Sequence, residues 1–227
     1  MSGLYIHIPF CASRCIYCGF YSTTVPQEQD AYIDAVCHEM ELRKEETESI
    51  STIYLGGGTP SLRSSRNLHK IFHYIDNLFS PAWDSVEVTI ECNPDDITPD
   101  FCSIIQSLPI NRVSMGAQTF SDERLRFLHR RHSSDEVPLA FERLRNHGIR
   151  NISIDLMFGF PNETLDEWCH DIDEAIILRP EHISAYSLQY EEGTLLYHLL
   201  KAGRIKEIDD ELYRSMYSTL CKRLADS

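Results

Sequence analysis

Three cysteines lie close together near the start of the sequence. Cys11, Cys15 and Cys18 have the spacing C-x3-C-x2-C and directly follow an apolar, strand-like run over residues 4–9. Three thiolates at this spacing can converge on one inorganic centre. A structural zinc site takes four ligands, and an ordinary ferredoxin cluster takes four cysteines. Three thiols with no fourth close by therefore favour a 4Fe–4S cluster with one open iron, at which a reactant can bind.

Zinc binding and disulfide bonding are two alternative roles for these thiols. The zinc spacings allowed for cysteine pairs overlap this run, so the spacing alone leaves zinc open. Disulfides are rare in the reducing cytosol, and no charged and apolar leader precedes Leu4. We therefore expect a cytoplasmic protein with reduced thiols. We expect the remaining cysteines to be small, buried, apolar residues: Cys37, Cys92, Cys102, Cys169 and Cys221.

Composition and charge limit the possible classes of protein. The chain has 227 residues, a length that fits one α/β domain, and contains no apolar run of transmembrane length. Its formal net charge is −14, which repels a polyanion, so we expect no nucleic acid among its partners. One local basic patch stands out, and we expect most of it to be a solvated helix surface: Arg124, Arg126, Arg130 and Arg131.

The elements that position these residues alternate between strands and helices. Strand-like runs cover residues 4–9, 52–55, 86–92, 112–116, 151–158 and 182–188. Helical patterns cover residues 27–46, 62–79, 99–108, 121–147, 164–178 and 209–224. Six βα units in a row predict an α/β fold with a parallel sheet. The periodicity alone leaves open whether this sheet curls into a barrel or lies open with helices on both faces.

Polar or glycine-rich segments follow the predicted strands. They are the cysteine loop, which carries Cys11, Cys15 and Cys18, the glycine loop of residues 56–60, residues 91–94, 116–120 and 189–193, and Asp155 with residues 159–161. Ligand sites of parallel α/β proteins lie at the carboxyl ends of the strands, so we expect these segments to share one rim. Glu91 and Asp155 sit within apolar, β-branched runs, where an unpartnered carboxylate is costly to bury. Both carboxylates are therefore predicted to have hydrogen-bonded roles at the rim.

Taken together, the motifs resemble the oxygen-independent coproporphyrinogen III oxidase-like family of radical S-adenosylmethionine (SAM) proteins. The resemblance covers residues 4 to about 193 and implies a partial (βα)6 TIM-like barrel, with residues 1–227 as a single domain. Its motifs are the C-x3-C-x-aromatic-C run with Tyr17, Tyr5-Ile-His-Ile-Pro-Phe-Cys11, Gly56-Gly-Gly-Thr-Pro60, Glu91-Cys-Asn-Pro94, Ser114-Met-Gly-Ala-Gln-Thr-Phe120 and Ile154-Asp-Leu-Met-Phe-Gly-Phe-Pro161.

The resemblance also implies which residues bind the cofactors. Cys11, Cys15 and Cys18 would ligate the 4Fe–4S cluster, and SAM would chelate the fourth iron. The implied SAM shell consists of Tyr5, Tyr17, Gly57, Gly58, Thr59, Glu91, Gln118, Arg130, Asp155 and Gln189. Arg130 follows Gln118 at the family's spacing, whereas Tyr5 and Gln189 match more loosely. The implied chemistry is electron transfer from the reduced cluster to the sulfonium of SAM.

Two departures from the oxidases favour the family's heme chaperone branch. Phe20 stands where the oxidases have a fourth cysteine, and the motifs begin at residue 5 without the extension that oxidases carry. We therefore expect a heme chaperone whose partners are heme or a porphyrin, an electron donor and membrane-bound respiratory heme acceptors. The alternative is an enzyme, an oxygen-independent coproporphyrinogen III oxidase (dehydrogenase).

Two further expectations follow from this resemblance. The family continues into a C-terminal domain with a His-Asn-x-x-Tyr-Trp motif, which is absent from this chain. A third role for a radical SAM protein, the modification of RNA, is disfavoured by the charge of −14 and by the lack of an added RNA-binding domain.

Overall fold

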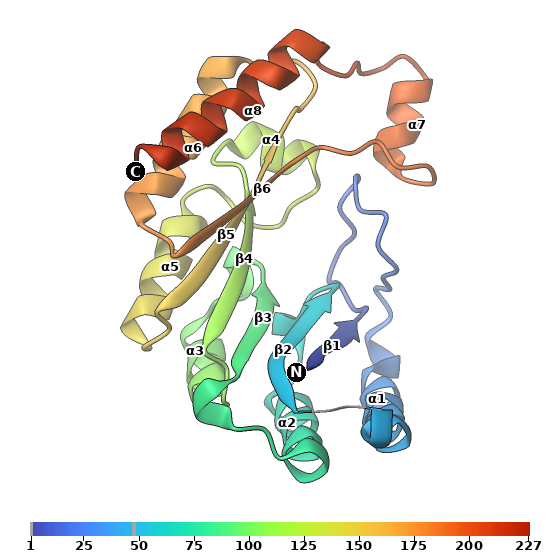
Figure 1. The fold of residues 1–227 in the computed structure, drawn as a ribbon. Helices are drawn as coiled ribbons and strands as arrows, with labels where there is room; N and C mark the ends of the chain where they lie inside the picture. The colour runs from blue at the N-terminus through green and yellow to red at the C-terminus, as the bar shows by residue number, and fades with distance from the viewer. Residues whose placement is uncertain (1, 47–48) are drawn as a thin grey trace.

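The computed structural model describes residues 2–46 and 49–227 and contains one six-stranded parallel sheet. Its strands pair in chain order, and within the described residues the two outer strands do not pair with each other. Figure 1 shows the sheet curling around an interior that stays open on one side. The sheet is therefore a partial barrel. Its strands are β1 (Ser2–Ile8), β2 (Ile50–Gly57), β3 (Glu87–Cys92), β4 (Arg112–Gln118), β5 (Asn151–Phe158) and β6 (His182–Ser187).

The helices alternate with the strands along the chain, and most of them cover the outer face of the sheet, whereas the short helix Leu195–Lys201 lies apart from that face, near the cysteine loop (Figure 1). They are α1 (Gln29–Arg43), α2 (Ser65–Phe79), α3 (Pro99–Gln106), α4 (Asp122–Phe127), α5 (Glu136–Asn146), α6 (Leu165–Leu178), α7 (Leu195–Lys201) and α8 (Asp210–Ala225). Short 3₁₀ helices are η1 (Pro26–Glu28), η2 (Lys44–Glu46), η3 (Pro60–Leu62), η4 (Trp83–Ser85) and η5 (Pro94–Asp96). In the described ranges, no helix has both the length and the apolar character needed to cross a membrane.

Several helices begin where a side-chain oxygen accepts a hydrogen bond from a free backbone N–H of the first turn. The capping residues are Ser64, Thr98, Ser121, Thr164, Thr194 and Asp209. Thr164 also forms a reciprocal capping box with Glu167. Such caps stabilise a helix by about 1 kcal/mol each and fix its first residue.

One helical expectation is wrong, and one short helix was not expected. The helix predicted over residues 121–147 is two helices, because α4 ends at Phe127 and His129 adopts a left-handed conformation with φ 60°. Leu125 and Leu128 before the break, and Val137, Ala140 and Leu144 after it, each keep a helical spacing of buried residues, so the pattern alone does not show where the first helix ends. The sequence reading also missed α7, a helix of only seven residues.

Side chains alternate strictly along the strands between the helices and the barrel interior. The outward set is buried and apolar: Ile53, Leu55, Val88, Ile90, Val113, Met115, Ile152 and Ile154. The inward set is polar: Tyr54, Glu91, Arg112, Ser114, Asp155 and Ser184. Neighbouring residues of a strand point to opposite faces, so this pattern places the core outside the sheet and leaves a polar interior.

A second apolar cluster holds the cysteine loop against the rest of the rim. Its buried members are Ile16, Leu128, Met157, Phe160, Leu188 and Leu196. The Ile16 N–H donates to the carbonyl of Leu128 at 3.1 Å, and the Ile16 carbonyl accepts from the Leu196 N–H at 2.9 Å. Figure 1 shows this loop reaching across the open side of the barrel toward α7. The loop is thus fixed by both packing and backbone hydrogen bonds.

Candidate cofactor site

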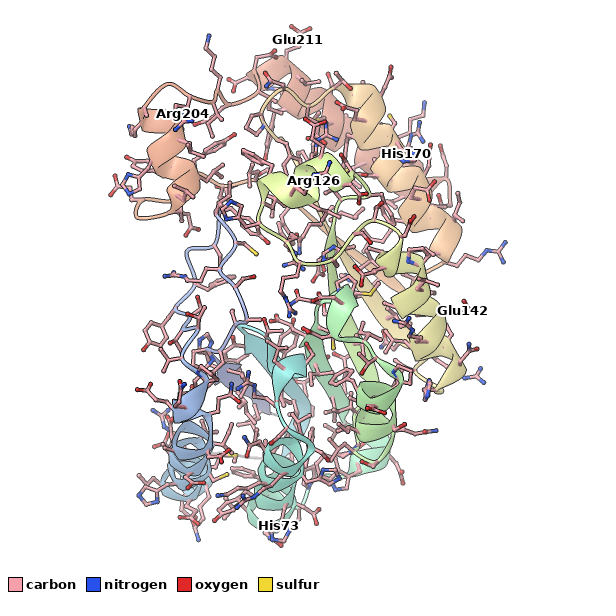
Figure 2. The ribbon with its side chains drawn as sticks, turned by 180° about the vertical axis from the view of Figure 1, so that it is seen from behind. His73, Arg126, Glu142, His170, Arg204 and Glu211 are labelled. Carbon is pink, nitrogen blue, oxygen red and sulfur yellow. The ribbon has the colours of Figure 1, made fainter. Side chains whose placement is uncertain are left out.

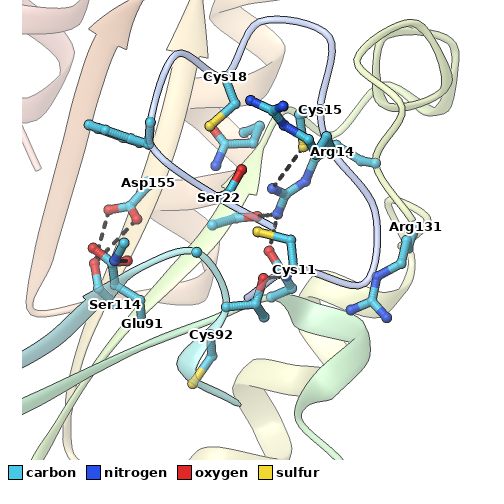
Figure 3. Close-up of a pocket in the computed structure, with 18 of the residues that line it drawn as sticks. Cys11, Arg14, Cys15, Cys18, Ser22, Glu91, Cys92, Ser114, Arg131 and Asp155 are labelled. Atoms are coloured by element: carbon cyan, nitrogen blue, oxygen red, sulfur yellow. Dashed lines mark hydrogen bonds between the residues drawn. The ribbon is translucent and has the colours of Figure 1, made fainter. Parts of the chain in front are cut away.

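A cavity of about 580 Å³ opens at the carboxyl ends of the strands. Most of the residues that the sequence predicted as a site line this one cavity (Figure 3): Cys11, Cys15, Tyr17, Cys18, Gly57, Gly58, Thr59, Glu91, Gln118, Arg130 and Asp155. They come from loops after β1 and β2, from β3, β4 and β5, and from the turn between α4 and α5. The structure therefore brings together groups that are far apart in the sequence.

The cysteine loop supplies three free thiols to this cavity. The loop is closed at its base by a hydrogen bond from the Cys11 N–H to the Thr23 carbonyl at 2.9 Å and by one from the Thr23 N–H to the Pro9 carbonyl at 2.7 Å. Burial raises the pKa of the Cys11 and Cys18 thiols. In residues 2–46 and 49–227, no three His, Cys, Asp or Glu side chains converge on a single-ion position.

Arg130 places a positive charge next to these thiols. Its Nη1 donates to the Cys15 sulfur at 3.8 Å, and its Nη2 donates to Asn93 Oδ1 and to the Gly116 carbonyl, both at 2.6 Å. Burial alone would lower the pKa of Arg130, but Tyr17 and Cys15 act against this effect and leave the pKa raised. The guanidinium therefore remains charged and can attract an anion beside the cysteines.

Hydrogen bonds link the glycine loop at the end of β2 to Glu91 near the end of β3. The Gly57 N–H donates to Glu91 Oε2 at 2.9 Å, and the Tyr54 hydroxyl donates to Glu91 Oε1 at 2.8 Å. Gly58 approaches the chain after β1 so closely that an added Cβ would lie 2.7 Å from the Ile8 carbonyl oxygen. A side chain would not fit there, so glycine is required for the loop to lie this near the cysteines.

Asp155 and Gln118 form the polar wall deeper in the cavity. Ser114 Oγ donates to both carboxylate oxygens of Asp155, at 3.1 and 3.2 Å. Burial raises the pKa of Asp155 to about 6. Gln118 ends β4 with φ 68°, and its Oε1 accepts from the Tyr186 hydroxyl at 3.4 Å. The wall thus presents hydrogen-bonding groups to a polar ligand.

Two of the predicted shell residues do not line this cavity. Tyr5 is 57% exposed, stacks on Tyr54 with ring centroids 6.0 Å apart, and hydrogen-bonds His7 Nδ1 at 3.1 Å. Gln189 is exposed, and its Nε2 donates to Ser187 Oγ at 2.7 Å. These were the two positions with the looser sequence match.

The other cysteines differ in their surroundings. Cys37, Cys92 and Cys102 are buried as expected, and Figure 3 shows the Cys92 sulfur turned away from the three cysteines of the loop. The expectation of burial is wrong for Cys221, which is exposed, and for Cys169, which is half-buried. Both lie on the outer helices α6 and α8, where the sequence pattern did not separate the inner from the outer face.

Several lining residues were missed by the sequence analysis. Asn93 and Asp95 follow β3, whereas Tyr54, Ser114 and Tyr186 are inward-facing residues of strands. A signal for Tyr54 and Ser114 was present in the sequence, because each lies two residues before a glycine of a predicted rim segment, Gly56 or Gly116, and so points to the same face of its strand. Tyr186 and the orientation of Asn93 toward Arg130 had no such signal.

Acidic neighbours largely neutralise the basic patch. The Arg124 Nη2 lies 2.7 Å from Glu167 Oε2, and Arg131 pairs with Asp95 and Asp96 at 2.7 and 2.6 Å. Arg126 is exposed on the outer surface of α4 (Figure 2). Arg130 is therefore the member of the patch whose guanidinium turns toward the thiols.

The chemistry of these residues fits an iron–sulfur cluster with SAM beside it. Thiolates are soft ligands that suit iron–sulfur clusters, and three of them leave one iron of a 4Fe–4S cluster open. Arg130, adjacent to Cys15, supplies a charge complementary to bound anions. The glycine loop exposes backbone to a ligand, and the cavity is large enough for a small molecule.

The chain matches the Radical SAM superfamily over residues 5–175 and belongs to that superfamily. The superfamily implies a 4Fe–4S cluster and SAM. A solved structure of coproporphyrinogen III oxidase (HemN) from Escherichia coli, described as a radical SAM enzyme, has a TM-score of 0.86 and 25% sequence identity to this chain. The match covers 99% of this chain and 52% of that one. The partial (βα)6 barrel expected from the sequence is thereby confirmed.

Curated relatives named heme chaperone HemW are more similar in sequence. The Bacillus subtilis protein is 38% identical, with 99% of this chain and 60% of the relative covered. The Escherichia coli protein is 35% identical, with 85% of this chain and 52% of the relative covered. The chain thus spans between half and two thirds of the length of these relatives. The resemblance to the heme chaperone branch is confirmed at the level of sequence.

Proposed function

We propose that this chain is the radical SAM part of a cytoplasmic heme chaperone. It binds a 4Fe–4S cluster through Cys11, Cys15 and Cys18, and binds SAM at the open iron. Its partners are heme or a porphyrin, an electron donor for the cluster and membrane-bound respiratory acceptors of heme. The observation that carries this proposal is the gathering of three free thiols, Arg130 and the glycine loop in one cavity, in a chain similar to heme chaperones over almost its whole length.

The residues of the cavity have separate tasks in this proposal. Arg130 holds the carboxylate of SAM, because a charge-assisted hydrogen bond is strong and directional. Backbone groups of Gly57 and Gly58 meet the methionyl part, and Glu91 fixes the loop through the Gly57 N–H. Asp155 and Gln118 offer hydrogen bonds from the inner wall, and Tyr17 lies near the adenine. When bound, the cluster supplies one-electron chemistry to the sulfonium.

The second candidate function is oxygen-independent coproporphyrinogen III oxidation. It is supported by the likeness to the HemN structure, with its TM-score of 0.86. Phe20 argues against it, because an apolar ring at the cavity edge, 70% exposed, cannot supply the fourth thiol expected of the oxidases. The greater sequence similarity to proteins named as heme chaperones also favours the first proposal.

Turnover separates the two functions. The full-length natural protein, reconstituted without oxygen, is incubated with SAM, a reductant and coproporphyrinogen III, and products are separated by chromatography. A parallel heme titration is followed by absorbance. We expect stoichiometric heme binding and no protoporphyrinogen. Because enzymes commonly turn over about 1 to 1000 times per second, more than one equivalent of product would be easily seen and would assign the oxidase activity instead.

A further inference from the structure

Arg63 is a buried cation that has no ion-pair partner within the part of the chain that the structure describes. It directly follows η3, the short helix at the end of the glycine loop, and is only 4% exposed. Its Nε and Nη1 atoms are buried without a hydrogen-bond partner. Across residues 2–46 and 49–227, no carboxylate forms an ion pair with it. Such a group is costly to bury, so its position calls for an explanation.

The cysteine loop fixes where this guanidinium lies. The Arg63 Cζ is 4.9 Å from the centroid of the Phe10 ring, a distance at which a cation and an aromatic face attract each other. Phe10 directly precedes Cys11, the first of the three cysteines, and the ring is itself buried. Arg63 is therefore held next to the start of the cysteine loop.

Two nearby groups can balance this charge. Burial lowers the pKa of Arg63 to about 10, and the charges of Cys11 and Asp96 oppose that lowering. Asp96 is already engaged, because it accepts from Ser61 Oγ at 2.9 Å and pairs with Arg131 at 2.6 Å. Cys11 is a neutral thiol when free but carries negative charge when it ligates iron. Arg63 therefore obtains a negatively charged neighbour when Cys11 ligates the cluster.

We propose that Arg63 is a positioning residue for the iron–sulfur cluster: its buried charge stabilises the negative charge that Cys11 and the cluster acquire together, and so raises the reduction potential of the cluster. This inference rests on the proposed binding of a cluster by the cysteine loop. Charge near a cluster and hydrogen bonds around it are general determinants of its potential. Reduction adds one electron, so a nearby positive charge favours the reduced form.

The proposal predicts effects of opposite sign in the two states of the protein. In the cluster-free protein, Arg63→Met removes an unmatched buried charge while keeping a side chain of similar length. The denaturation midpoint should stay the same or rise. In the cluster-loaded protein, the same substitution removes the stabilising charge. The equilibrium constant for reduction should fall about tenfold, which is about 59 mV to more negative potential for one electron.

The test compares four proteins: wild type, Arg63→Met, Arg63→Lys and Arg66→Met. Arg66 is an exposed arginine three positions away on α2 and controls for the loss of one charge. Each protein is reconstituted without oxygen, its iron and sulfide are measured, and its potential is determined by a redox titration followed by electron paramagnetic resonance. We expect the shift in Arg63→Met, almost none in Arg66→Met, and a potential near that of wild type in Arg63→Lys.

The outcomes distinguish this inference from the proposed function. A wild-type protein that binds no iron and sulfide would overturn both. A wild-type cluster with equal potentials in Arg63→Met and Arg66→Met would overturn the inference alone. A cluster-free Arg63→Met protein that unfolds at clearly lower denaturant, or fails to fold while Arg63→Lys folds, would show that the side chain serves only to support the fold, and would also overturn the inference.

Discussion

At the scale of single residues, four arginines of the same chemical type differ in function because their side chains have different partners. Arg124 and Arg131 pair with carboxylates, Arg126 is exposed, and Arg130 donates to Cys15. The four arginines lie within eight positions of the chain, but only Arg130 places its charge against the thiols. Its neighbours Asn93 and the Gly116 carbonyl hold the guanidinium in this orientation. A substitution at this position should therefore affect cofactor binding more than any other in the patch.

Arg130→Ala tests the assignment of this arginine. We expect SAM binding to the reconstituted protein to weaken by about 1.5 to 3 kcal/mol, which is the usual contribution of a hydrogen bond to a charged group. Arg126→Ala is the matched control, because it removes an exposed arginine four positions earlier. Isothermal titration calorimetry measures both. Equal affinities in the two variants would show that Arg130 does not bind SAM.

The raised pKa of Asp155 predicts a dependence of stability on pH. Burial raises this pKa to about 6, from about 3.9 in an unfolded chain. The folded protein therefore binds more protons than the unfolded chain between these values, and the free energy of unfolding decreases as pH rises through this window. Asp155→Asn removes the titrating carboxyl group, so its contribution to the pH dependence of the free energy of unfolding should disappear. The variant should be more stable than wild type by about 1 to 2 kcal/mol at pH near 7.5, with a smaller difference at pH near 4.

Urea denaturation of the cofactor-free protein across this pH range measures the effect. Glu142→Gln, at an exposed position in the middle of α5, serves as the control for the loss of one surface carboxylate. A wild-type protein whose stability increases between pH 4 and 6 relative to Asp155→Asn would show that the pKa of Asp155 is lowered instead.

The sequence predicted most of the residues that line the cavity, because these residues lie at the carboxyl ends of strands or directly after them. Glu91 and Asp155 were recognised as carboxylates in apolar strands, and both lie in the cavity. Gln189, which matched more loosely, lies on the loop after β6, is not among the residues that line the cavity, and hydrogen-bonds Ser187. Arg63 was not recognised at all. Its burial depends on Phe10 and on the course of the glycine loop, and neither contact leaves a local pattern in the sequence.

At the scale of elements, the cysteine loop is held at its middle as well as at its ends. Ile16, between Cys15 and Cys18, is buried against Leu128 and Leu196 and hydrogen-bonds both of their backbones. α7 therefore supports the loop from the far side of the barrel opening (Figure 1). We infer that the position of the thiols depends on a helix almost two hundred residues away in sequence.

Leu196→Ala tests this support. Truncating a fully buried leucine should lower the free energy of unfolding by about 2 to 5 kcal/mol. It should also speed tryptic cleavage after Arg14, an exposed residue of the cysteine loop. Leu195→Ala is the control, because Leu195 is 49% exposed and its truncation should change stability by no more than about 0.5 kcal/mol. If both variants were cleaved after Arg14 at the wild-type rate, α7 would not support the loop.

The sequence predicted the order of elements better than their ends. Strand-like runs of four to eight residues identified all six strands, because the outer face of each strand packs against the helices. The break between α4 and α5 was missed because it is made by the left-handed backbone of His129. This break turns Arg130 inward, so the misjudged boundary lies at the site itself. α7 was too short for periodicity to detect.

At the scale of the whole molecule, the partial barrel separates an apolar exterior from a polar interior. Inward residues of β2 to β6 that line the cavity include hydroxyl, carboxylate, amide and guanidinium groups, whereas outward residues pack against the helices. Such an interior suits a polar ligand like SAM better than an apolar macrocycle. We therefore expect heme to contact the protein outside this interior. Saturating SAM should leave the affinity for heme unchanged in a titration of the full-length natural protein, and competition between the two ligands would contradict this expectation.

The measurement that tests the central claim most directly is reconstitution of wild type and cysteine variants without oxygen. Iron and sulfide are quantified, and the reduced cluster is examined by electron paramagnetic resonance before and after addition of SAM. We predict about four irons and four sulfides per wild-type chain, a spectrum that changes with SAM, loss of the cluster in Cys11→Ala, Cys15→Ala and Cys18→Ala, and an intact cluster in Cys92→Ala. A single zinc ion in the wild-type protein, a spectrum insensitive to SAM, or loss of the cluster in Cys92→Ala would contradict the account.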